Sequence, residues 1–390
     1  MESLKNNDPF LKGKKLAIAL SGGVDSVVLL HYLAQNYNTN LRAIHINHQL
    51  SKHSGEWQKF CQDLCFSLKI KYENIDIIVE NAANIEENAR KSRYLALANN
   101  LAKDEILLSA HHQNDQAETL LLQLFRGSGV AGLASMPSRK PLGKGWHYRP
   151  LLQIQKSSIM DYADRHKLRW IEDDSNFNTN FRRNFLRLEI LPKLSEVYNN
   201  LGKTLSRAAG HQADALRLCE DLALIDIQQN SLKSGNRLEV SGLIKLEKYR
   251  LKNVLKFHLN SLKFLSPTAK VMEKIIELLS AKKDAKPLVS WDKFEIRRYK
   301  NQLYFINNKT NLPPPICRFQ TEFEQFEGFE IRHRAEGQKV KLAGKNHSQT
   351  LKKILQEAGI PPWERQKLKM YYVSGELKAM EKIGYLQEVK

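Results

Sequence analysis

Short apolar runs alternate with amphipathic stretches over residues 15–126, and this alternation limits the possible folds more than any other feature of the 390-residue chain. The apolar runs that we predict as strands are residues 15–20, 41–47, 75–79 and 105–110. Each is followed by a stretch whose apolar residues recur with helical spacing. Single helices between strands are typical of an α/β domain with a doubly wound parallel sheet. Ligands bind such sheets beyond the carboxyl ends of the strands, which here means residues 21–26 and 111–118.

The rest of the chain predicts further, smaller folding units. Residues 127–150 are rich in Gly, Pro and basic residues and predict a long loop, while the Leu-Pro-Pro-Pro run at 312–315 predicts a stiff linker. Most of the sequence between these two segments has helical spacing, with a β-rich stretch at 288–305. We therefore predict three domains, which are the doubly wound domain over residues 1–200, a mostly helical middle domain over 201–311 and a small α+β domain over 316–390.

The composition favours a polyanionic partner. Lys and Arg total 61 and Asp and Glu total 42, so the formal net charge is +19. An excess this large usually marks a nucleic-acid-binding protein, although a cation-rich surface can also serve solubility alone. The four cysteines show no disulfide-framework spacing, which favours a reducing, cytoplasmic location. No signal-peptide core or membrane-length apolar run occurs in the sequence, so we expect no membrane partner.

A glycine-containing loop joins the first predicted strand to the first predicted helix. Its residues are Ser21, Gly22, Gly23, Val24, Asp25 and Ser26. Glycines allow close approach of a ligand to the backbone, and the helix start offers unpaired N–H groups to an anion. The loop lacks the Gly-Lys-Ser/Thr of a Walker A motif and the G-x-G-x-x-G of a dinucleotide fingerprint. We interpret it as a pyrophosphate cradle rather than a plain capped turn, with a cation such as Mg²⁺ between Asp25 and the phosphates.

A second polar cluster follows the fourth predicted strand. Asp115 and Glu118 are spaced i, i+3, so both project from one face of the first helical turn, with His111 just before it. Acidic residues are favourable in any first helical turn, so the spacing alone leaves a structural and a functional interpretation equally open. A zinc-type third ligand is not evident near this cluster.

Several sequence motifs, in the same order, resemble one known family. They are SGGVDS at 21–26, INHQLS at 46–51, NIEENARKSRY at 84–94, HHQNDQAETLLLQLFRGSG at 111–129, RPLL at 149–152, EDDSNFNTNFRRNFLRLEILPKL at 172–194 and LKKILQEAGIPPWERQKLKMYY at 351–372. The first is similar to the PP-loop of the N-type ATP pyrophosphatases. The full set resembles the tRNA(Ile)-lysidine synthetase family, from the first loop to the tail with a weak middle over residues 200–310.

The resemblance implies a reaction and a set of substrates. ATP would adenylate the wobble cytidine of the CAU anticodon of tRNA(Ile), and free L-lysine would then displace AMP to give lysidine, so the enzyme would be an AMP-forming ligase. Residues 1–200 would be the PP-loop ATP-binding catalytic domain, and the other two domains would bind tRNA. The cofactors would be ATP, as a substrate, and Mg²⁺. The oligomeric state stays open, with a homodimer as one alternative.

The resemblance also assigns roles to individual residues. Catalytic roles fall to Asp25, Arg90, His111, Asp115, Glu118 and Arg183. Asp25 and Asp115 would hold Mg²⁺, whereas Asp115 and Glu118 would bind lysine, with Glu118 as the free carboxylate for its ammonium group. The family often has one arginine where this chain has Arg182 and Arg183, and we choose Arg183 because it directly precedes Asn184.

The basic and aromatic tail would recognise tRNA through phosphates and unpaired bases, with binding residues Lys352, Lys353 and Arg365. Three other functions compete with this interpretation. A tRNA 2-thiolase of the same superfamily would use Cys-x-x-Cys pairs, and this chain has none. A glutamine-dependent synthetase would need a catalytic cysteine domain, and Cys61 and Cys65 instead lie in a helical pattern. A non-catalytic RNA-binding module would not need an intact loop with Asp25.

Overall fold

The computed structural model describes residues 10–37, 40–49, 53–78, 85–230, 232–234, 236–281, 287–308, 318–334, 338–342 and 348–388. It divides into two compact units, residues 1–221 and 222–390. The division falls inside helix α9 (Leu201–Gln229), C-terminal to the boundary that we predict at residue 200. The predicted linker at 312–315 lies outside the described residues.

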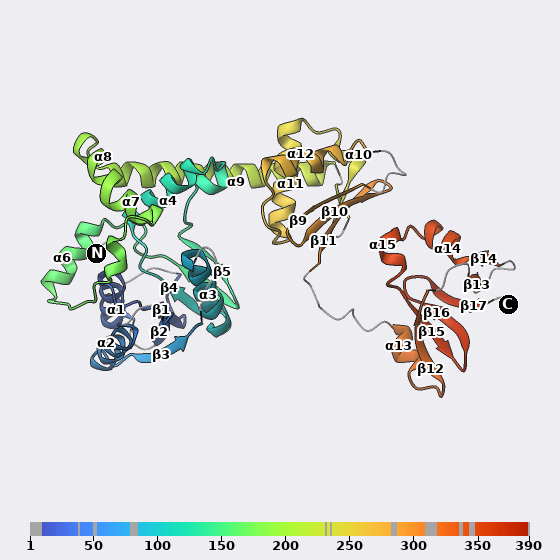
Figure 1. Ribbon diagram of the computed structural model, residues 1–390, viewed down its shortest axis with the longest axis horizontal. Helices are drawn as coiled ribbons and strands as arrows, with labels where there is room; N and C mark the ends of the chain where they lie inside the picture. Colours follow the sequence, from blue (N-terminus) through green and yellow to red (C-terminus); the bar gives the residue numbers. More distant parts are fainter. Residues whose placement is uncertain are drawn as a thin grey trace. The chain divides into compact units, whose positions relative to one another are not determined.

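The first unit contains the parallel sheet that the sequence predicts (Figure 1). Its strands, in spatial order, are β3 (Lys71–Asp76), β2 (Leu41–Asn47), β1 (Leu16–Ala19), β4 (Ile106–Leu108), β6 (Gly145–Tyr148) and β5 (Arg139–Leu142). Neighbouring strands are parallel except for β5, which is antiparallel to β6 at the edge. The strand order reverses between β1 and β4, and ligands bind doubly wound sheets at such a switch point.

Two expectations for this unit are wrong. Strand β3 occupies Lys71–Asp76, earlier than the predicted run at 75–79. Residues 127–150 are not one long loop, because they contain the short helix α5 (Val130–Leu133) and the β5–β6 hairpin. Pro141 lies in β5, where the open edge of the sheet tolerates a residue without a backbone N–H.

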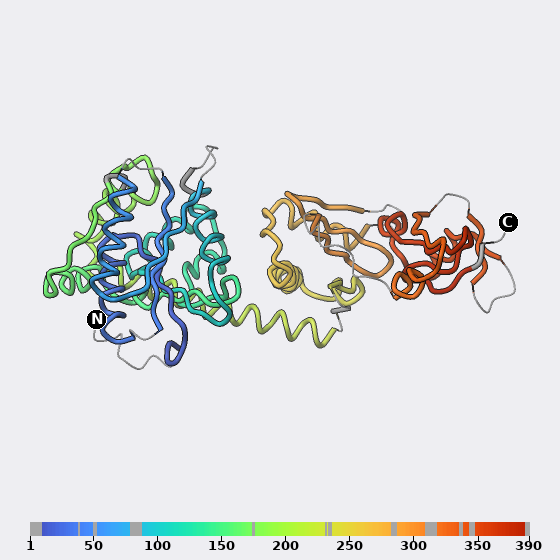
Figure 2. The backbone as a smooth tube through the Cα atoms, turned by 90° about the horizontal axis from the view of Figure 1, so that it is seen from below, coloured from blue at the N-terminus to red at the C-terminus, as the bar shows by residue number. Residues whose placement is uncertain are grey.

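Helices cover both faces of the sheet, as Figures 1 and 2 show. On one face α1 (Val24–Asn36), α2 (Ser54–Ser67) and α6 (Lys156–Arg165) bury a core with Leu16 and Ile18 of β1. On the other face α3 (Ile85–Asn100) packs Leu97 against Ala17, which points the opposite way from its strand neighbours. These two cores confirm the doubly wound α/β architecture, which fixes the carboxyl ends of β1 and β4 side by side.

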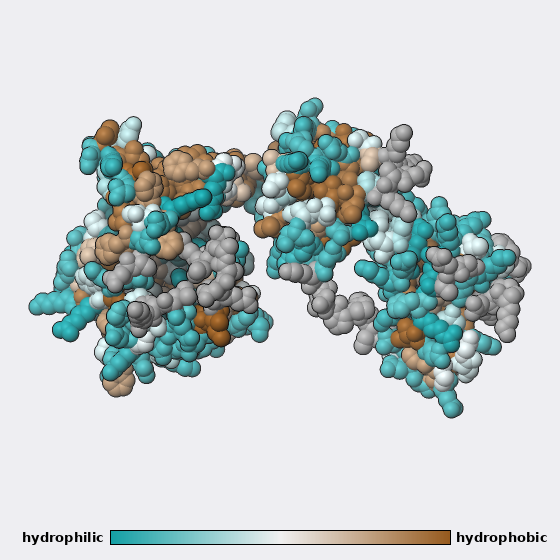
Figure 3. Space-filling view, in the orientation of Figure 1, coloured by the Kyte–Doolittle hydropathy of each residue, from teal (hydrophilic) through white to brown (hydrophobic). Residues whose placement is uncertain are grey.

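A run of helices extends the first unit beyond the sheet. It consists of α4 (Gln113–Phe125), η2 (Asp174–Phe177), α7 (Arg182–Phe185), the π-turn η3 (Leu186–Ile190), α8 (Leu191–Val197) and the start of α9. Figure 3 shows apolar residues at the surface along the α8–α9 segment. Val197 and Tyr198 are both exposed there.

The second unit contains two antiparallel sheets. In the middle segment the sheet order is β7 (Lys233–Ser234), β8 (Arg237–Glu239), β11 (Gln302–Asn307), β10 (Phe294–Tyr299) and β9 (Leu288–Trp291). It shares a core with α11 (Lys248–Ser261) and α12 (Ala269–Glu277), while α10 (Val240–Leu243) follows β8. Residues 200–285 are mostly helical, as the spacing predicts, apart from β7 and β8. The predicted β-rich stretch at 288–305 forms β9, β10 and β11.

The tail forms the α+β fold that the sequence predicts. Its sheet order is β12 (Phe329–His333), β15 (Lys369–Val373), β16 (Glu376–Met380), β17 (Gly384–Glu388), β13 (Lys339–Leu342) and β14 (Gln349–Thr350). Helix α14 (Leu351–Glu357) packs on one core, α13 (Arg318–Phe323) packs on a second, and α15 (Pro362–Arg365) follows α14. Among the helices that the structure describes, none has the length and apolar character to cross a bilayer.

Candidate functional site

The loop after β1 is a tight turn that only glycine can make. Gly22 has φ +87°, and a Cβ there would lie 2.7 Å from Ile171 Cδ1. The Ser21 and Ser26 hydroxyl oxygens lie 3.1 Å apart, and Ser26 Oγ also donates to Gly23 O. The N-cap residue of α1, Gly23, makes no side-chain cap hydrogen bond, so the N–H groups of the first turn are available to an anion.

Asp25 lies in the first turn of α1 and pairs with a lysine from a distant part of the chain. Lys156 Nζ, at the start of α6, donates to Asp25 Oδ1 at 2.6 Å. Both side chains remain about a third exposed, with relative exposures of 30% for Asp25 and 33% for Lys156. Lys156 therefore places a cation beside residues 21–26, which we call the phosphate loop. Its ammonium group can move from Asp25 to an anion that binds there.

His112, rather than His111, lies between the two predicted aspartates. Its Nε2 is 3.7 Å from an Asp25 oxygen and 3.6 Å from an Asp115 oxygen. His112 also caps α4, since its Nδ1 accepts the Asn114 N–H while Asp115 Oδ2 accepts the His112 N–H. Asp115 thus caps the helix and also lies beside Asp25 and His112. The structural and the functional interpretation of its position are therefore compatible.

Glu118 is not the free carboxylate that we expect from the sequence. Its side chain is 1% exposed and accepts hydrogen bonds from two arginines, at 2.6 Å from Arg183 Nε and 2.7 Å from Arg187 Nε. Both guanidinium groups also reach Asp115 Oδ1, at 3.0 and 3.3 Å. Burial alone raises the pKa of Asp115, but the charges of His112 and Arg183 outweigh it and lower the pKa to about 2.

His111 points into a separate cluster beside β6. Ser109 Oγ lies 2.8 Å from His111 Nδ1 and 2.7 Å from His147 Nε2, which links the two rings. The buried Arg149 donates to His147 Nδ1 and to Pro137 O. Burial, together with nearby arginines, lowers the pKa of His111 to about 3 and that of His147 to about 2, so both rings are neutral near pH 7.

These two histidines predict that the stability of the first unit, residues 1–221, falls in acid. Because their folded pKa values lie below the unfolded value of about 6.5, the unfolded state binds more protons once the pH falls below that value. The free energy of unfolding is highest above about pH 6.5. It falls as the pH is lowered toward about 3, by up to about 1.4 kcal/mol per pH unit for each histidine. Chemical unfolding at pH 7.5 and 5.5 should show this loss, and His147→Gln should reduce it. The exposed His211→Gln is the control, and equal unfolding free energies at both pH values would contradict the prediction.

Arg90 lies on α3 next to this histidine cluster. Its guanidinium is exposed and stands 5.2 Å from the centre of the Tyr94 ring. The charge of Arg90 contributes to the lowered pKa of both His111 and His147. The structure therefore brings Arg90 and His111 into one cluster and Asp25, Asp115, Glu118 and Arg183 into another.

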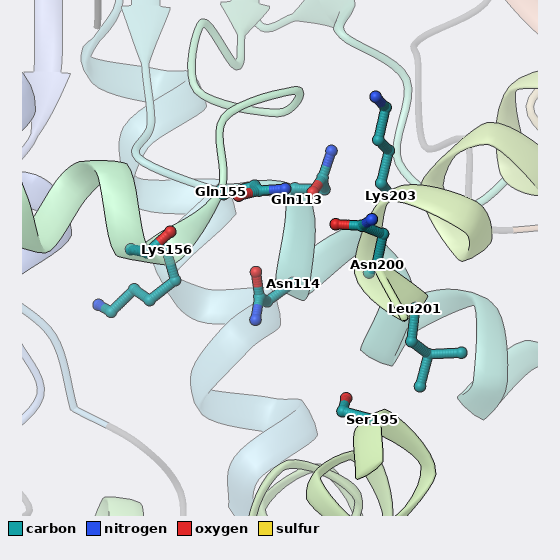
Figure 4. Close-up of a pocket in the computed structure, with 10 residues that line it drawn as sticks. Gln113, Asn114, Gln155, Lys156, Ser195, Asn200, Leu201 and Lys203 are labelled. Carbon is teal, nitrogen blue, oxygen red and sulfur yellow. The ribbon is translucent and has the colours of Figure 1, made fainter. Parts of the chain in front are cut away.

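A polar pocket of about 260 Å³ includes Lys156, the ion-pair partner of Asp25 (Figure 4). Its lining residues are Gln113, Asn114, Gln155, Lys156, Ser157, Ser195, Asn200, Leu201, Gly202 and Lys203. Asn114 and Asn200 lie near its centre in Figure 4, with Lys156 and Lys203 on opposite sides. None of these lining residues is acidic, so the pocket suits an anionic group better than an ammonium group.

Asp25 and Asp115 could hold a metal ion only if a substrate supplied further ligands. In the part of the chain that the structure describes, no group of three or more His, Cys, Asp and Glu residues is placed to hold a metal. Mg²⁺ commonly uses one or two carboxylates together with substrate phosphates and water. Asp25 fits this pattern, since it is partly exposed at the phosphate loop, whereas both Asp115 oxygens already accept protein hydrogen bonds.

The predicted tRNA-binding residues of the tail have different environments. Lys352 and Lys353 are exposed on α14, where both ammonium groups can reach a polyanion. Arg365 is 9% exposed, and its guanidinium donates to Ile360 O at 2.8 Å and to Tyr299 Oη at 3.1 Å. These contacts make Arg365 a packing residue in this structure, because its charge does not face solvent.

Comparison with known proteins identifies the family. A family model for the PP-loop domain matches residues 1–194, and models described as the TilS substrate binding domain and the TilS substrate C-terminal domain match 238–304 and 329–390. The tRNA(Ile)-lysidine synthase of Coxiella burnetii (strain RSA 493 / Nine Mile phase I) is 37% identical over 399 residues, which covers 94% of this chain and 88% of that protein. The chain belongs to the tRNA(Ile)-lysidine synthase family.

A second member of the tRNA(Ile)-lysidine synthase family, from Legionella pneumophila (strain Lens), is 38% identical over 406 residues, covering 95% of this chain and 91% of its own. Among solved structures, the U34-tRNA thiolase NcsA from Methanococcus maripaludis aligns with a TM-score of 0.44 and 17% identity over 54% of this chain and 77% of its own. The family matches confirm the predicted PP-loop domain at the N-terminus and the predicted family.

Sequence reasoning missed several residues of the site. His112 was visible only as the second residue of a His-His pair, and Arg187 only as one turn beyond Arg183. Lys156 and Arg149 come after the β5–β6 hairpin in the sequence. Their positions in the sequence do not indicate that they lie near the loop after β1 or the end of β4. Only the folded chain brings them to the site.

Proposed function

We propose that this protein ligates free L-lysine to C2 of the wobble cytidine in the CAU anticodon of tRNA(Ile), using ATP and forming AMP and pyrophosphate. The observation that carries the proposal is the phosphate loop with Asp25 at the switch point of the sheet, in a chain that belongs to the tRNA(Ile)-lysidine synthase family over almost its whole length. The product base would pair with A instead of G, which changes both the codon and the aminoacylation specificity of the tRNA from methionine to isoleucine. The reaction belongs to the cytoplasm, where mature tRNA is available.

The reaction proceeds in two displacements. The cytosine O2 attacks the α-phosphorus of ATP, and the bond from that phosphorus to the bridging oxygen breaks to release pyrophosphate. The lysine amine then attacks C2, the C2–O2 bond breaks, AMP leaves with that oxygen, and the amine loses a proton. Residues 21–26 would bind the pyrophosphate portion through backbone N–H groups and the Ser21 and Ser26 hydroxyls.

Asp25 would hold Mg²⁺ together with the ATP phosphates, and the ion would neutralise charge on the leaving pyrophosphate. The adjacent Lys156 would shift from Asp25 to a phosphate oxygen as ATP binds. Asp115 could bind the metal only if it lost the hydrogen bond that it accepts from His112 or from Arg183. We therefore propose that its main role is to position those two residues.

Arg183 and Arg187 would stabilise negative charge on the phosphates, for which a guanidinium is well suited. Glu118 would hold both arginines in place, which replaces its predicted role as the ammonium ligand. His111 is neutral near pH 7, so it would donate or accept a hydrogen bond at the base or the α-phosphate rather than supply a charge.

The test of this proposal is mass analysis of the wobble nucleoside after incubation with ATP, isotope-labelled lysine and bulk tRNA. A mass increase carrying the lysine label on an isoleucine tRNA is the expected result. Incorporation of sulfur from a sulfur donor would favour a 2-thiolase. An unchanged nucleoside with intact tRNA binding would favour a non-catalytic RNA-binding module.

A charge reversal on α14 tests the predicted tRNA contact of the tail. The double variant Lys352→Glu/Lys353→Glu should weaken tRNA binding, because each phosphate contact contributes about 0.7–0.9 to the slope of log K against log salt. The slope should fall by about 1.4–1.8 if both lysines contact phosphates. Filter binding at several salt concentrations measures it. The control is Lys378→Glu, which removes an exposed tail lysine paired with Glu376, and the prediction is wrong if both variants give equal slopes.

A further inference from the structure

Three cationic side chains gather around the ring of Tyr94. Arg90 and Tyr94 belong to α3, whereas Lys140 lies on β5 and Arg149 follows β6. The Lys140 Nζ stands 5.3 Å from the centre of the Tyr94 ring, and Arg90 stands 5.2 Å from it. Lys140 pairs with His147 across the hairpin, so both side chains point to the same face of the sheet, where the Tyr94 and His147 rings lie 5.6 Å apart.

Among the side chains that the structure describes, no carboxylate is paired with this cluster. Within the described parts of the chain, no carboxylate oxygen lies within 4.0 Å of a nitrogen of Arg90, Lys140 or Arg149. The charge of Asp115 acts on the adjacent His111, and Asp115 is already paired with Arg183. Like charges this close are unfavourable, and burial together with the charges of Arg149 and Arg90 accordingly lowers the pKa of Lys140. An uncompensated cation cluster of this kind is stabilised when an anion binds.

Arg149 adds an independent observation. Its side chain is 3% exposed, and its Nε has no hydrogen-bond acceptor even though it is buried. A buried guanidinium with an unused donor is costly unless a ligand or another group supplies the acceptor. The other guanidinium nitrogens donate to His147 and Pro137, and the Arg149 side chain also hydrogen-bonds to Tyr94, which fixes the guanidinium beside the two rings.

We propose that Lys140, together with Arg90 and Arg149, binds a phosphate group of a substrate against the face formed by Tyr94 and His147. This proposal deepens the proposed function, because the cluster is linked through Ser109 to His111 at the end of β4. The phosphate is either the α-phosphate of ATP or a backbone phosphate next to the wobble nucleotide. Lys140 is the residue that the sequence did not predict and that can reach a ligand, since it is partly exposed.

The test compares Lys140→Gln with a matched control on the same hairpin. Lys144 lies at the exposed turn between β5 and β6, so Lys144→Gln removes the same charge from the same hairpin without changing the cluster. Direct binding of ATP is measured by calorimetry and direct binding of tRNA by filter binding at several salt concentrations. These two readouts require neither lysine transfer nor AMP formation. Lys140→Arg, which keeps the charge, should restore most of the binding.

The two sources of phosphate give different results. If the RNA supplies it, Lys140→Gln weakens tRNA binding about 5- to 50-fold and lowers the salt slope by about 0.7–0.9, with ATP affinity unchanged. If ATP supplies it, ATP affinity falls by a similar factor and the salt slope for tRNA stays the same. If both affinities match those of Lys144→Gln, the proposal is overturned. If the unaltered protein transfers no lysine but Lys140→Gln still weakens the binding of ATP or tRNA, the proposed function is rejected. The proposal of a phosphate site is then still supported.

Discussion

Asp25→Ala should greatly slow AMP formation while leaving tRNA binding unchanged. Asp25 is the only carboxylate in the phosphate loop, and it lies 2.6 Å from Lys156 Nζ. Without it, Lys156 becomes free to bind phosphate, so the affinity for ATP should hold or increase. The charge that develops on the leaving pyrophosphate would lose its metal-bridged stabilisation, which should reduce the rate by at least about 10²–10³-fold. The measurement is single-turnover release of pyrophosphate at saturating ATP.

Asp161→Ala is the matched control, because Asp161 is an exposed aspartate on α6, the helix that begins with Lys156. It should keep the normal rate. A normal rate in Asp25→Ala would reject the role of Asp25 with Mg²⁺. A large loss of ATP affinity with an unchanged saturated rate would instead make Asp25 a determinant of nucleotide binding only.

The location of the site could be predicted because local signals and topology agree. The glycines of residues 21–26 lie between a strand and a helix, and the His-His segment follows another strand of the same alternation. Parallel connections then force the ends of β1 and β4 to the same edge, which the strand order confirms. No tertiary information was needed for this step.

The partners within the site could not be predicted in the same way. The i, i+3 spacing of Asp115 and Glu118 gives a shared helix face but not what packs against it. Lys156 meets Asp25 across 131 residues of sequence, and Arg187 reaches Glu118 from the π-turn η3. Glu118 therefore looks free in the sequence and is paired in the structure.

Loop composition misled the prediction for residues 127–150. Pro141 and Gly143 favour a loop, yet β5 lies at the edge of the sheet, where proline costs no sheet hydrogen bond and Gly143 supplies a turn with φ +56°. That hairpin carries Lys140 and leads into Arg149, so the error also concealed the cation cluster around Tyr94. Basic composition likewise did not reveal that Arg365 is buried, since charge counts contain no information on exposure.

Glu118→Gln should destabilise the catalytic unit and remove the adenylation step, rather than raise the lysine requirement alone. The amide keeps the shape of the side chain but loses the charge that opposes two guanidinium groups. Breaking a buried ion pair costs about 3–5 kcal/mol, and we expect about 2–3 kcal/mol here because Arg187 is 38% exposed. Arg183 would then be held by Asp115 alone. Chemical unfolding measures the first effect, and single-turnover trapping of the adenylated tRNA measures the second.

Glu189→Gln provides the comparison, because Glu189 lies on the same π-turn as Arg187 and forms only an exposed pair with Lys193. It should change the free energy of unfolding by less than about 1 kcal/mol, as exposed ion pairs do. If Glu118→Gln forms the adenylated intermediate normally and only needs more lysine, Glu118 contacts the amino acid after all, and the two arginines are held by Asp115 alone. If it forms no intermediate at any lysine concentration, the buried carboxylate acts through Arg183 and Arg187 on the phosphate chemistry.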